Sequence, residues 1–347
     1  MANITRVGVD IAKSIFHVHG VDRFEKTQWK GKYSRRKWID ALVKKVPKEA
    51  VIAMEACGSA HYWGRELSKR GFTVKLIHPK FVKPYVKSNK NDAVDAEAIC
   101  EAMARPNMRF VQIKTVQQQD VQSAHRIREK LMQQRTAKVN HIRGLVAEYG
   151  VIAPIGIKNL REAIPTWLED AENHLSTIFR QLLSGLADDL SYVDNRIDEL
   201  NLIIKQHVET DAVASQLIEV RGVGVLCASA LTSAIGDGKA YRKGRDFAAS
   251  LGLTPRQHST GGKDRLLGIS KRGDGYLRKL LVHGARAVIR HAKEKNDHLS
   301  QWLNKLLKTK HVNIVTVALA NKIARIAWAM VAGDKQYQPN LAAQLTE

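Results

Sequence analysis

Short apolar runs alternate with amphipathic helical patterns over the first hundred residues, and this alternation restricts the fold more than any other feature. From Thr5 to about Arg105, four runs have the length and composition of strands: "RVGVDIA", "IFHVHGV", "AVIAMEA" and "FTVKLIHP". Helical spacing is present in "SRRKWIDALVKKV", "HYWGRELSKRG" and "DAVDAEAICEAMAR", the last with Asn91 or Asp92 near its N-cap. Strands that alternate with helices predict an α/β domain.

Helix-forming residues fill the chain from about Thr115 to Thr210. Apolar residues recur there at steps of three and four, which predicts an antiparallel helical hairpin or an oligomeric coiled coil. The predicted stripes are Ala124, Ile127, Leu131, Ile142, Leu145 and Tyr149, and then Leu175, Ile178, Leu182, Leu186, Val193, Ile197, Leu200, Ile204 and Val208. Basic residues beside the first stripe, such as Arg128, Arg135 and Lys138, are expected to face solvent or a phosphate backbone.

A glycine turn opens the last part of the chain, in "LIEVRGVGVLCASALTSAIG". Gly222 and Gly224 lie between two apolar helical patterns, as in a helix-hairpin-helix, whose backbone N–H groups bind phosphate. A plain tight turn uses the same residues. The sequence thus predicts four parts, namely an α/β domain over 1–110, a helical coiled-coil region over 111–212, a mainly helical domain with this hairpin-like turn over 213–335 and a tail over 336–347.

The formal net charge of the 347 residues is +22, because 56 Lys and Arg stand against 34 Asp and Glu. This excess favours a polyanionic partner, and nucleic acid is favoured over a membrane because no apolar run has the length of a bilayer span. The late segment "HVNIVTVALANKIARIAWAMVAG" is broken by Asn321, Lys322 and Arg325, so it predicts a buried helix. The N-terminus lacks a signal-peptide pattern, and the three cysteines form no CxxC pair, which fits reduced thiols in a cytosol.

Four carboxylates stand out against this basic background. Asp10 and Glu55 each lie within an apolar strand, and Asp92 and Asp95 lie three residues apart at a helix start. Three of these acids have an ordinary structural explanation. Asp92 could simply cap its helix, Asp95 could interact favourably with the helix dipole, and the Glu55 side chain could point to solvent. A carboxylate in a covered strand, the position expected for Asp10, is costly unless its charge is lost or compensated. Divalent metal bound by all four carboxylates would compensate their negative charges. Two such ions about 4 Å apart stabilise both oxygens of an in-line phosphoryl displacement.

The motifs "GVDIAK", "MEACG" and "NKNDAVDAEAI", in this order and spacing, resemble those of the DEDD insertion-sequence transposases, whose N-terminal domain is a RuvC-like variant of the RNase H fold. The run "ASLGLTPRQHSTGGKDRLLGISKRGDGYLRKLLVHGARAV" resembles the C-terminal transposase domain of the same family, so the resemblance covers almost the whole chain. It implies Mg²⁺ or Mn²⁺ held by Asp10, Glu55, Asp92 and Asp95. It also implies double-stranded DNA at element ends and target, a bridge-type noncoding RNA as guide, and a homo-oligomer such as a dimer or tetramer. Together with the apolar pattern and the cysteines, it leads us to expect a bacterial cytoplasmic location at the nucleoid and no membrane partner.

The resemblance further implies a C-terminal serine that attacks the phosphodiester and forms a covalent protein–DNA intermediate, as in a serine recombinase. In "GLTPRQHSTGG", Thr260 stands directly before Gly261, where the family usually has serine, and Ser259 precedes it. A primary hydroxyl is less hindered than that of threonine, so chemistry favours Ser259 whereas strict register favours Thr260. Ser259 is the preferred nucleophile, and a polar turn without a catalytic role is the alternative for both residues.

Basic residues surround these two hydroxyls. Arg256, Lys263 and Arg265 flank them and are predicted to stabilise charge that develops on a phosphate, and His258 could serve as a general base. The segment "GISKRGDGYLRK" supplies a second group, which is predicted to contact a nucleic-acid backbone and consists of Lys271, Arg272, Arg278 and Lys279. An ordinary solvated surface is the alternative for this group.

The predicted function is a DNA recombinase, a transposase that cuts and rejoins the strands of an insertion sequence by phosphoryl transfer. By resemblance, the N-terminal acids and the C-terminal hydroxyl meet between protomers, and the RNA reads sequence by base pairing while the protein reads shape and backbone. One alternative is a metal-dependent Holliday-junction resolvase or nuclease that uses water. The other is a non-catalytic nucleic-acid-binding scaffold, against which the complete set of four acids argues.

Overall fold

The computed structural model describes residues 3–86, 92–333 and 337–338. The chain divides into two compact units, which we call the sheet unit (Met1–Gln117 with Gly236–Arg242) and the helical unit (Gln118–Ile235 with Lys243–Glu347). The four-part division of the sequence stays a prediction. Its tail at 336–347 lies outside the described residues except for 337–338, and so does Asn91 as a helix cap.

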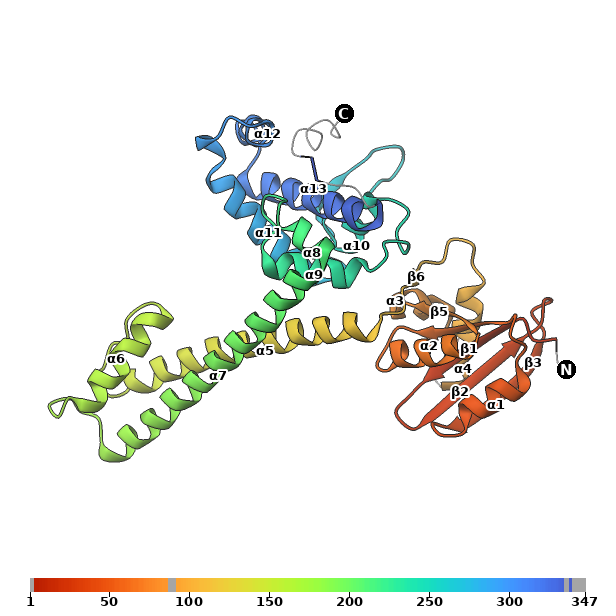
Figure 1. Ribbon diagram of the computed structural model, residues 1–347, viewed down its shortest axis with the longest axis horizontal. Helices are drawn as coiled ribbons and strands as arrows, with labels where there is room; N and C mark the ends of the chain where they lie inside the picture. Colours follow the sequence, from red (N-terminus) through yellow and green to blue (C-terminus); the bar gives the residue numbers. More distant parts are fainter. Residues whose placement is uncertain (1–2, 87–91, 334–336, 339–347) are drawn as a thin grey trace. The chain divides into compact units, whose positions relative to one another are not determined.

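A mixed six-stranded sheet forms the centre of the sheet unit (Figure 1). Its strands are β1 (Arg6–Ile11), β2 (Ile15–Val21), β3 (Thr27–Ser34), β4 (Val51–Glu55), β5 (Thr73–Ile77) and β6 (Phe110–Val111), in the order β3-β2-β1-β4-β5-β6. β1 runs antiparallel to β2 and parallel to β4, and β4 runs parallel to β5. The four strands predicted from apolar runs are confirmed, and β3 and β6 are additions.

Helices cover both faces of this sheet, which explains why its central strands are almost continuously apolar. The helical segments of the unit are α1 (Trp38–Lys45), α2 (Ala60–Lys69), α3 (Pro79–Val82), η1 (Lys83–Tyr85) and α4 (Asp92–Met103). On one face Phe16 stacks on Trp38 with ring centroids 4.9 Å apart, and Trp63 packs edge-on against both rings. On the other face Ala53 and Ile77 join the α4 residues in a separate core cluster.

The helical unit begins with an antiparallel pair of long helices, α5 (Val116–Ala147) and α7 (Thr177–Thr210), with α6 (Ile157–Glu169) packed at one end (Figure 1). This arrangement is an antiparallel helical hairpin, one of the two alternatives predicted from the sequence; the oligomeric coiled coil stays a prediction. Its stripes differ in part from the prediction, because Ile127, Ile178 and Leu182 have exposed fractions of 49%, 71% and 60%. Phe179 and Leu183 are buried in their place, since they face α6 and the end of α5.

Three basic residues of α5 also differ from expectation. Arg128 donates a hydrogen bond to Asn201, Arg135 lies 3.2 Å from the Asp194 carboxylate, and Lys138 forms an ion pair with Asp189; all three partners are on α7. These side chains therefore link the two long helices instead of standing free in solvent or on a phosphate backbone.

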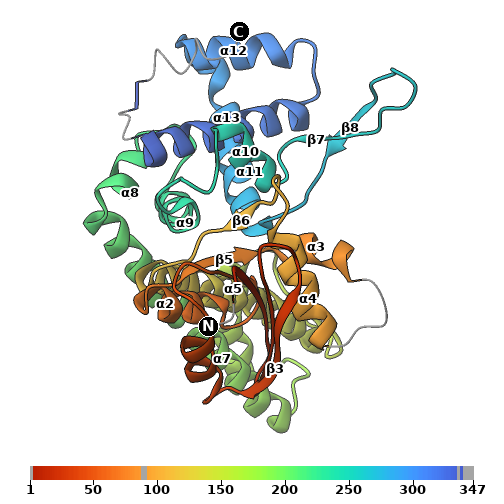
Figure 2. The ribbon, with the colours of Figure 1, turned by 90° about the vertical axis from the view of Figure 1, so that its right-hand side faces the viewer.

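Further helices and one β-hairpin make up the rest of the described part of the helical unit. They are α8 (Ala212–Leu217), α9 (Val225–Ile235), α10 (Gly244–Ser250), β7 (Pro255–Gln257), β8 (Leu266–Ile269), α11 (Gly275–Arg290), η2 (Ala292–Glu294), α12 (His298–Leu307) and α13 (Val312–Gly333). Figure 2 shows the β7–β8 hairpin extending away from the helices of its unit. The predominance of helix here agrees with the prediction.

Helix α13 has the length and the apolar composition of a membrane span, contrary to the expectation that no segment would. Half of its apolar window is buried inside the protein. Val315, Leu319 and Ile323 are each 1% exposed, and the helix packs against α10 and α11. These contacts make α13 the core helix of its unit, as the sequence predicted for this segment.

Candidate active site

Asp10 and His17 lie directly opposite each other on two antiparallel strands of the sheet unit. The β1–β2 register pairs Asp10 with His17, and Asp92 is the first residue of α4, which packs across both strands. One ligand atom from each of these three residues lies within 4.8 Å of the other two. His17 Nδ1 is 3.7 Å from Asp92 Oδ2. Two acids predicted from sequence are thus brought together with a histidine that was not predicted.

Gly8 allows α4 to approach the sheet closely enough for this cluster to form. A Cβ atom at Gly8 would lie 2.2 Å from the carbonyl oxygen of Ala96 and 2.6 Å from the amide nitrogen of Cys100, both in α4. No side chain larger than hydrogen fits this contact without moving the helix. Because Gly8 and Asp10 are two residues apart, their Cα substituents point to the same face of β1. The same close contact therefore sets the distance between Asp10 and the start of α4.

The environment of His17 suits a divalent cation. Its Nδ1 atom is buried and has no hydrogen-bond partner, which is costly for a polar atom unless a ligand completes it. The His17 side chain is 14% exposed and that of Asp92 is 64% exposed, so the cluster lies at the edge of the core with one open side. Carboxylate oxygen and neutral imidazole nitrogen are ligands for Mn²⁺, and the carboxylates also suit Mg²⁺. The donor set thus fits a divalent metal.

Glu55 and Asp95 are near this cluster in the fold but are not part of it. Glu55 ends β4, the strand next to β1, and Asp95 lies half-buried in the first turn of α4. Desolvation raises the pKa of the neighbouring Cys57 thiol to about 11, with further contributions from the carboxylates of Glu55 and then Asp10. Glu55 and Asp10 therefore act on a common neighbour. Among the described residues, the close group contains only Asp10, His17 and Asp92, and the four-acid ligand set stays a prediction.

A second histidine of β2 faces a second carboxylate of α4. His19 Nδ1 lies 3.7 Å from Glu97 Oε2, and Lys30 Nζ lies 3.4 Å from the same oxygen. Burial lowers the pKa of His19, the Glu97 charge opposes that shift, and Lys30 adds a smaller lowering effect. His17 and His19 lie two residues apart on one face of β2, so both face α4. The alternation in "IFHVHGV", combined with the short turn after Asp10, is the sequence signal that could have found them.

Ser259 and Thr260, which carry the two candidate hydroxyls, belong to the segment that joins β7 to β8 in the helical unit. Ser259 Oγ donates a hydrogen bond of 2.6 Å to Asp264 Oδ1 and accepts one of 2.8 Å from Gln257 Nε2. Gln257 Nε2 also donates to Asp264 Oδ1 at 2.9 Å, and the hydrogen bonds that Asp264 accepts, from Ser259 first and Gln257 second, hold the pKa of its carboxyl below the usual value. The backbone of Thr260 pairs with that of Lys263 across the turn. The choice between the two hydroxyls stays a prediction.

The predicted basic residues fall into two groups. The first, which we call the exposed group, lies on the hairpin and in the loop after it and consists of Arg256, Lys263, Arg265, Lys271 and Arg272. The other two have partners within the protein: Arg278 donates to the Leu251 carbonyl oxygen at 2.8 Å, and Lys279, although exposed, forms an ion pair with Glu129 of α5. Arg278 and Lys279 thus stabilise the helical unit, and the exposed group is the better candidate for nucleic-acid contact.

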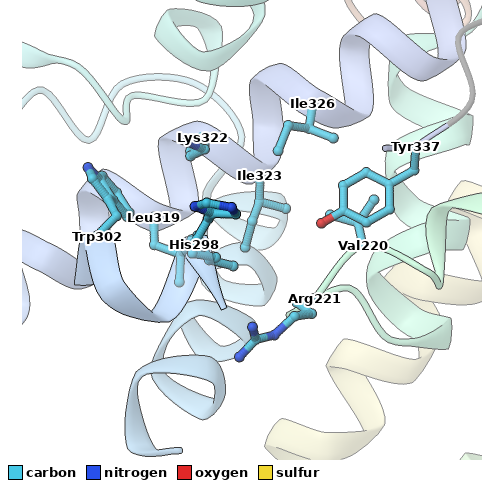
Figure 3. Close-up of a pocket in the computed structure, with 10 residues that line it drawn as sticks. Val220, Arg221, His298, Trp302, Leu319, Lys322, Ile323, Ile326 and Tyr337 are labelled. Atoms are coloured by element: carbon cyan, nitrogen blue, oxygen red, sulfur yellow. The ribbon is translucent and has the colours of Figure 1, made fainter. Parts of the chain in front are cut away.

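The Gly222–Gly224 turn is packed against other helices on one side. Gly222 has a φ of +92°, and a Cβ at Gly284 of α11 would lie 1.8 Å from the Gly222 carbonyl oxygen. This contact explains Gly222 as a tight turn, whereas Gly224 is exposed just before α9. The preceding Arg221 lines a small pocket that is also bordered by Trp302, Lys322 and Tyr337 (Figure 3). Arg221 is itself paired with Asp297 at 2.7 Å, so it holds α12 in place.

Comparisons with known proteins agree with the two-part organisation of these sites. Residues 7–151 match the family model of a transposase domain, the DEDD type of the IS110 family, and residues 214–300 match the family described as "Transposase IS116/IS110/IS902 family". The first domain type is RNase H-like and implies the use of divalent metal, in agreement with the donor set around Asp10.

Similar proteins extend over nearly the whole chain. A probable family 20 transposase of Pseudomonas aeruginosa is 49% identical over 338 residues, which cover 97% of this chain and 99% of the relative. The transposase for insertion sequence element IS1328 of Yersinia enterocolitica is 41% identical, with 95% and 97% covered. The transposase for IS1111A of Coxiella burnetii is also 41% identical, with 97% and 92% covered. The chain belongs to the IS116/IS110/IS902 family of insertion-sequence transposases.

Proposed function

We propose that this transposase cuts and rejoins DNA strands by phosphoryl transfer, with an acidic site in the sheet unit and the hydroxyl of Ser259 as nucleophile. The observation that carries the proposal is the Asp10–His17–Asp92 cluster, whose atoms lie within 4.8 Å of one another. A basic chain with exposed Arg and Lys beside a serine-bearing hairpin is suited to hold a DNA backbone near these groups.

The acidic site serves to bind and orient the scissile phosphate. Asp10 and Asp92 offer carboxylate oxygens and His17 offers a buried nitrogen, while Glu55 and Asp95 border the cluster from β4 and α4. Mg²⁺ or Mn²⁺ bound there would polarise the phosphate and neutralise its developing charge. Because the start of α4 is exposed at Asp92, a phosphate can approach from the solvent side.

Ser259 is the preferred nucleophile over Thr260. Its Oγ atom is oriented by two side chains, Gln257 and Asp264, at hydrogen-bond distance. Its hydroxyl is primary and therefore less hindered than that of threonine. Thr260 forms the base of the glycine turn, where its backbone pairs with Lys263. The polar turn without catalytic function is the alternative that the experiment below tests.

The proposed partners follow from the family resemblance and the charge. The protein binds double-stranded DNA at the element ends and at the target, and a bridge-type noncoding RNA selects both by base pairing. A homo-oligomer, dimer or tetramer, brings the acidic site of one protomer to the Ser259 hairpin of another. The complex acts in the bacterial cytoplasm at the nucleoid.

The test is to trap a covalent protein–DNA adduct on a denaturing gel. Wild-type protein, Asp10→Asn, Ser259→Ala and Thr260→Ala are incubated with Mg²⁺, a DNA junction of the element and RNA transcribed from its noncoding end. We expect adduct in wild type and Thr260→Ala, and none in Ser259→Ala. Asp10→Asn should bind DNA with unchanged affinity and form no adduct.

Each alternative predicts a different outcome. Nicked DNA without adduct in any sample would identify water as the nucleophile and support a resolvase or nuclease. DNA binding without nicks or adduct in wild type would support a scaffold. Full activity of Asp10→Asn would contradict the metal site.

A further inference from the structure

We propose that Asp264 accepts the proton of Ser259 during attack on the phosphodiester, a role that rests on Ser259 as the nucleophile of the proposed function. Ser259 Oγ donates to Asp264 Oδ1 at 2.6 Å, the distance of a charge-assisted hydrogen bond from a hydroxyl to a carboxylate. A base that activates a serine must stand at this distance from the hydroxyl. Asp264 therefore satisfies the geometric requirement in the isolated protein.

The hairpin register makes this contact a fixed feature of the fold. Gln257 pairs with Leu266, the His258 amide donates to the Arg265 carbonyl oxygen, and Thr260 pairs with Lys263. Between these pairs, Ser259 stands directly opposite Asp264. Directly opposite residues of antiparallel strands have side chains on the same face at contact distance. Gly261 and Gly262, with φ of +57° and +75°, close the tight turn that sets this register.

The same register separates the side chain of Ser259 from that of His258, the residue that the sequence suggested as one possible base. Residues alternate between the two faces of a hairpin, so Gln257, Ser259 and Asp264 share one face, whereas His258, Thr260 and their cross-strand partners belong to the other. His258 is therefore not positioned to take the Ser259 proton. Gln257 Nε2 donates to both Ser259 Oγ and Asp264 Oδ1, at 2.8 and 2.9 Å, and so holds the pair together.

The charge state of Asp264 suits this role at neutral pH. Hydrogen bonds from Ser259 and Gln257 keep its pKa below the ordinary value, so the carboxylate is ionised and available as an acceptor. By register, Lys263 and Arg265 belong to the other face of the hairpin. The face that carries Ser259 therefore presents the Asp264 carboxylate to the DNA. Charge that develops on the phosphate must then be neutralised by a group outside this face.

The step balances as follows. The Ser259 Oγ–H bond breaks, the proton passes to Asp264 Oδ1, and the oxygen electron pair forms a bond to phosphorus. One ester P–O bond breaks, and its deoxyribose oxygen leaves with the bonding electrons and takes a proton from water. The hydroxide so formed removes the proton from Asp264, which restores the carboxylate. When a strand hydroxyl later attacks the phosphoserine, Ser259 Oγ leaves and is reprotonated.

The experiment compares rates of adduct formation over pH 7 to 9.5 at saturating DNA, RNA and Mg²⁺. Asp264→Asn keeps a hydrogen-bond acceptor but loses the base, and we expect its rate at pH 7 to be roughly 10² to 10⁴ lower. Its rate should rise about tenfold per pH unit relative to wild type, because the reactive alkoxide must then form by loss of a proton to solvent. Asp264→Glu should recover part of the loss at pH 7.

Gln257→Ala is the matched control, because it removes a hydrogen bond to Ser259 without removing the base. It should lower the rate but leave the pH dependence parallel to that of wild type. A wild-type rate and slope in Asp264→Asn would overturn the proposal. So would a loss in Asp264→Asn that does not recover at high pH, since that result shows a role in positioning alone.

Two outcomes separate this proposal from the proposed function. Adduct that depends on Thr260 and not on Ser259 would remove the role of Asp264 while leaving covalent recombination intact. Nicked DNA with no adduct from wild type would contradict the covalent step itself.

Discussion

At the level of single residues, Asp10, His17 and Asp92 show how strand pairing brings together side chains of the kinds that bind divalent metal. Asp10 and His17 are brought together by the β1–β2 register, and Asp92 arrives from a helix more than seventy residues later. His17 Nδ1 is buried without a hydrogen-bond partner, so the cluster contains an atom that a cation would satisfy. The contribution of His17 to metal binding can therefore be measured without an assay of catalytic activity.

We expect His17→Ala to weaken binding of Mn²⁺ to the protein by at least about tenfold, because even changes behind a metal ligand cost that much. The measurement is isothermal titration with Mn²⁺, supported by the Mn²⁺-induced rise in the midpoint of thermal unfolding. His141→Ala is the control, since His141 is exposed on α5. Equal affinity in wild type and His17→Ala would exclude His17 as a ligand.

At the level of secondary-structure elements, close packing of α4 on the sheet positions the acidic site. The contact depends on Gly8, where a Cβ would lie 2.2 Å from a helix carbonyl oxygen. We expect Gly8→Ala to lower the free energy of unfolding of the sheet unit by roughly 1–3 kcal/mol, the usual cost of overpacking. Because α4 must shift, Mn²⁺ binding should weaken as well. Urea unfolding and Mn²⁺ titration measure the two effects.

Gly20→Ala on the adjacent strand is the control for Gly8→Ala. A Cβ at Gly20 meets its nearest neighbours, Ile4 and Trp29, at 3.4 Å, which is ordinary contact. Its stability and Mn²⁺ affinity should stay close to those of wild type. If Gly8→Ala behaves like Gly20→Ala, the close approach of α4 does not control the site.

A buried polar chain joins the long helices to the rest of the helical unit. His125 of α5 bonds to the Tyr276 hydroxyl of α11 at 2.9 Å and to Ser229 of α9 at 3.1 Å, and Ser229 also contacts His207 of α7 at 3.2 Å. Desolvation lowers the pKa of His125 to about 4, with smaller effects from Arg128 and His207. His125 is 3% exposed, so the folded protein holds it neutral.

This depressed pKa predicts acid sensitivity. Between pH 6.5 and 4 the unfolded chain protonates His125 and the folded chain does not, so the free energy of unfolding falls as pH decreases, by up to about 3 kcal/mol. Well above pH 6.5 His125 is neutral in both states, so the free energy of unfolding keeps its full value. Hydrogen exchange of α5 and α9 amides at pH 7.5 and 5 measures the difference in this free energy. His125→Gln should show a smaller pH dependence, and an equal dependence in both proteins would contradict the prediction.

At the level of the whole molecule, the exposed apolar residues of α7 bear on assembly. Ile178 and Leu182 lie one helical turn apart on the same face and are 71% and 60% exposed. If these two side chains were buried against a second copy of the chain, the burial would stabilise the homo-oligomer that we propose. We expect the double change Ile178→Glu and Leu182→Glu to reduce the sedimentation coefficient to that of a monomer.

Ser191→Glu is the control for this experiment, because it adds a charge at an exposed position of the same helix. It should leave the sedimentation coefficient unchanged. An oligomer that persists in the double variant would place the interface elsewhere. A wild-type protein that sediments as a monomer in the presence of RNA and DNA would contradict the homo-oligomer.

The prediction of elements from sequence succeeded where one physical signal was sufficient and failed where two competed. Apolar runs identified the central strands, but β3 alternates lysines with a buried Trp29 and contains no such run. On α7 the adjacent apolar pairs Ile178–Phe179 and Leu182–Leu183 are equally compatible with a helical stripe. Stacking of Tyr149 on Phe179, with centroids 4.1 Å apart, decides which member is buried.

The α/β character of the first part, the long helices of the second and the family were predictable from the sequence alone. These features depend on local periodicity and on motif spacing, which the order of residues contains directly. Tertiary structure alone decided that His17 joins Asp10 and Asp92, and that Asp264, not His258, contacts Ser259. Both contacts depend on strand register, and a shift of one residue would turn each side chain to the opposite face of its strand.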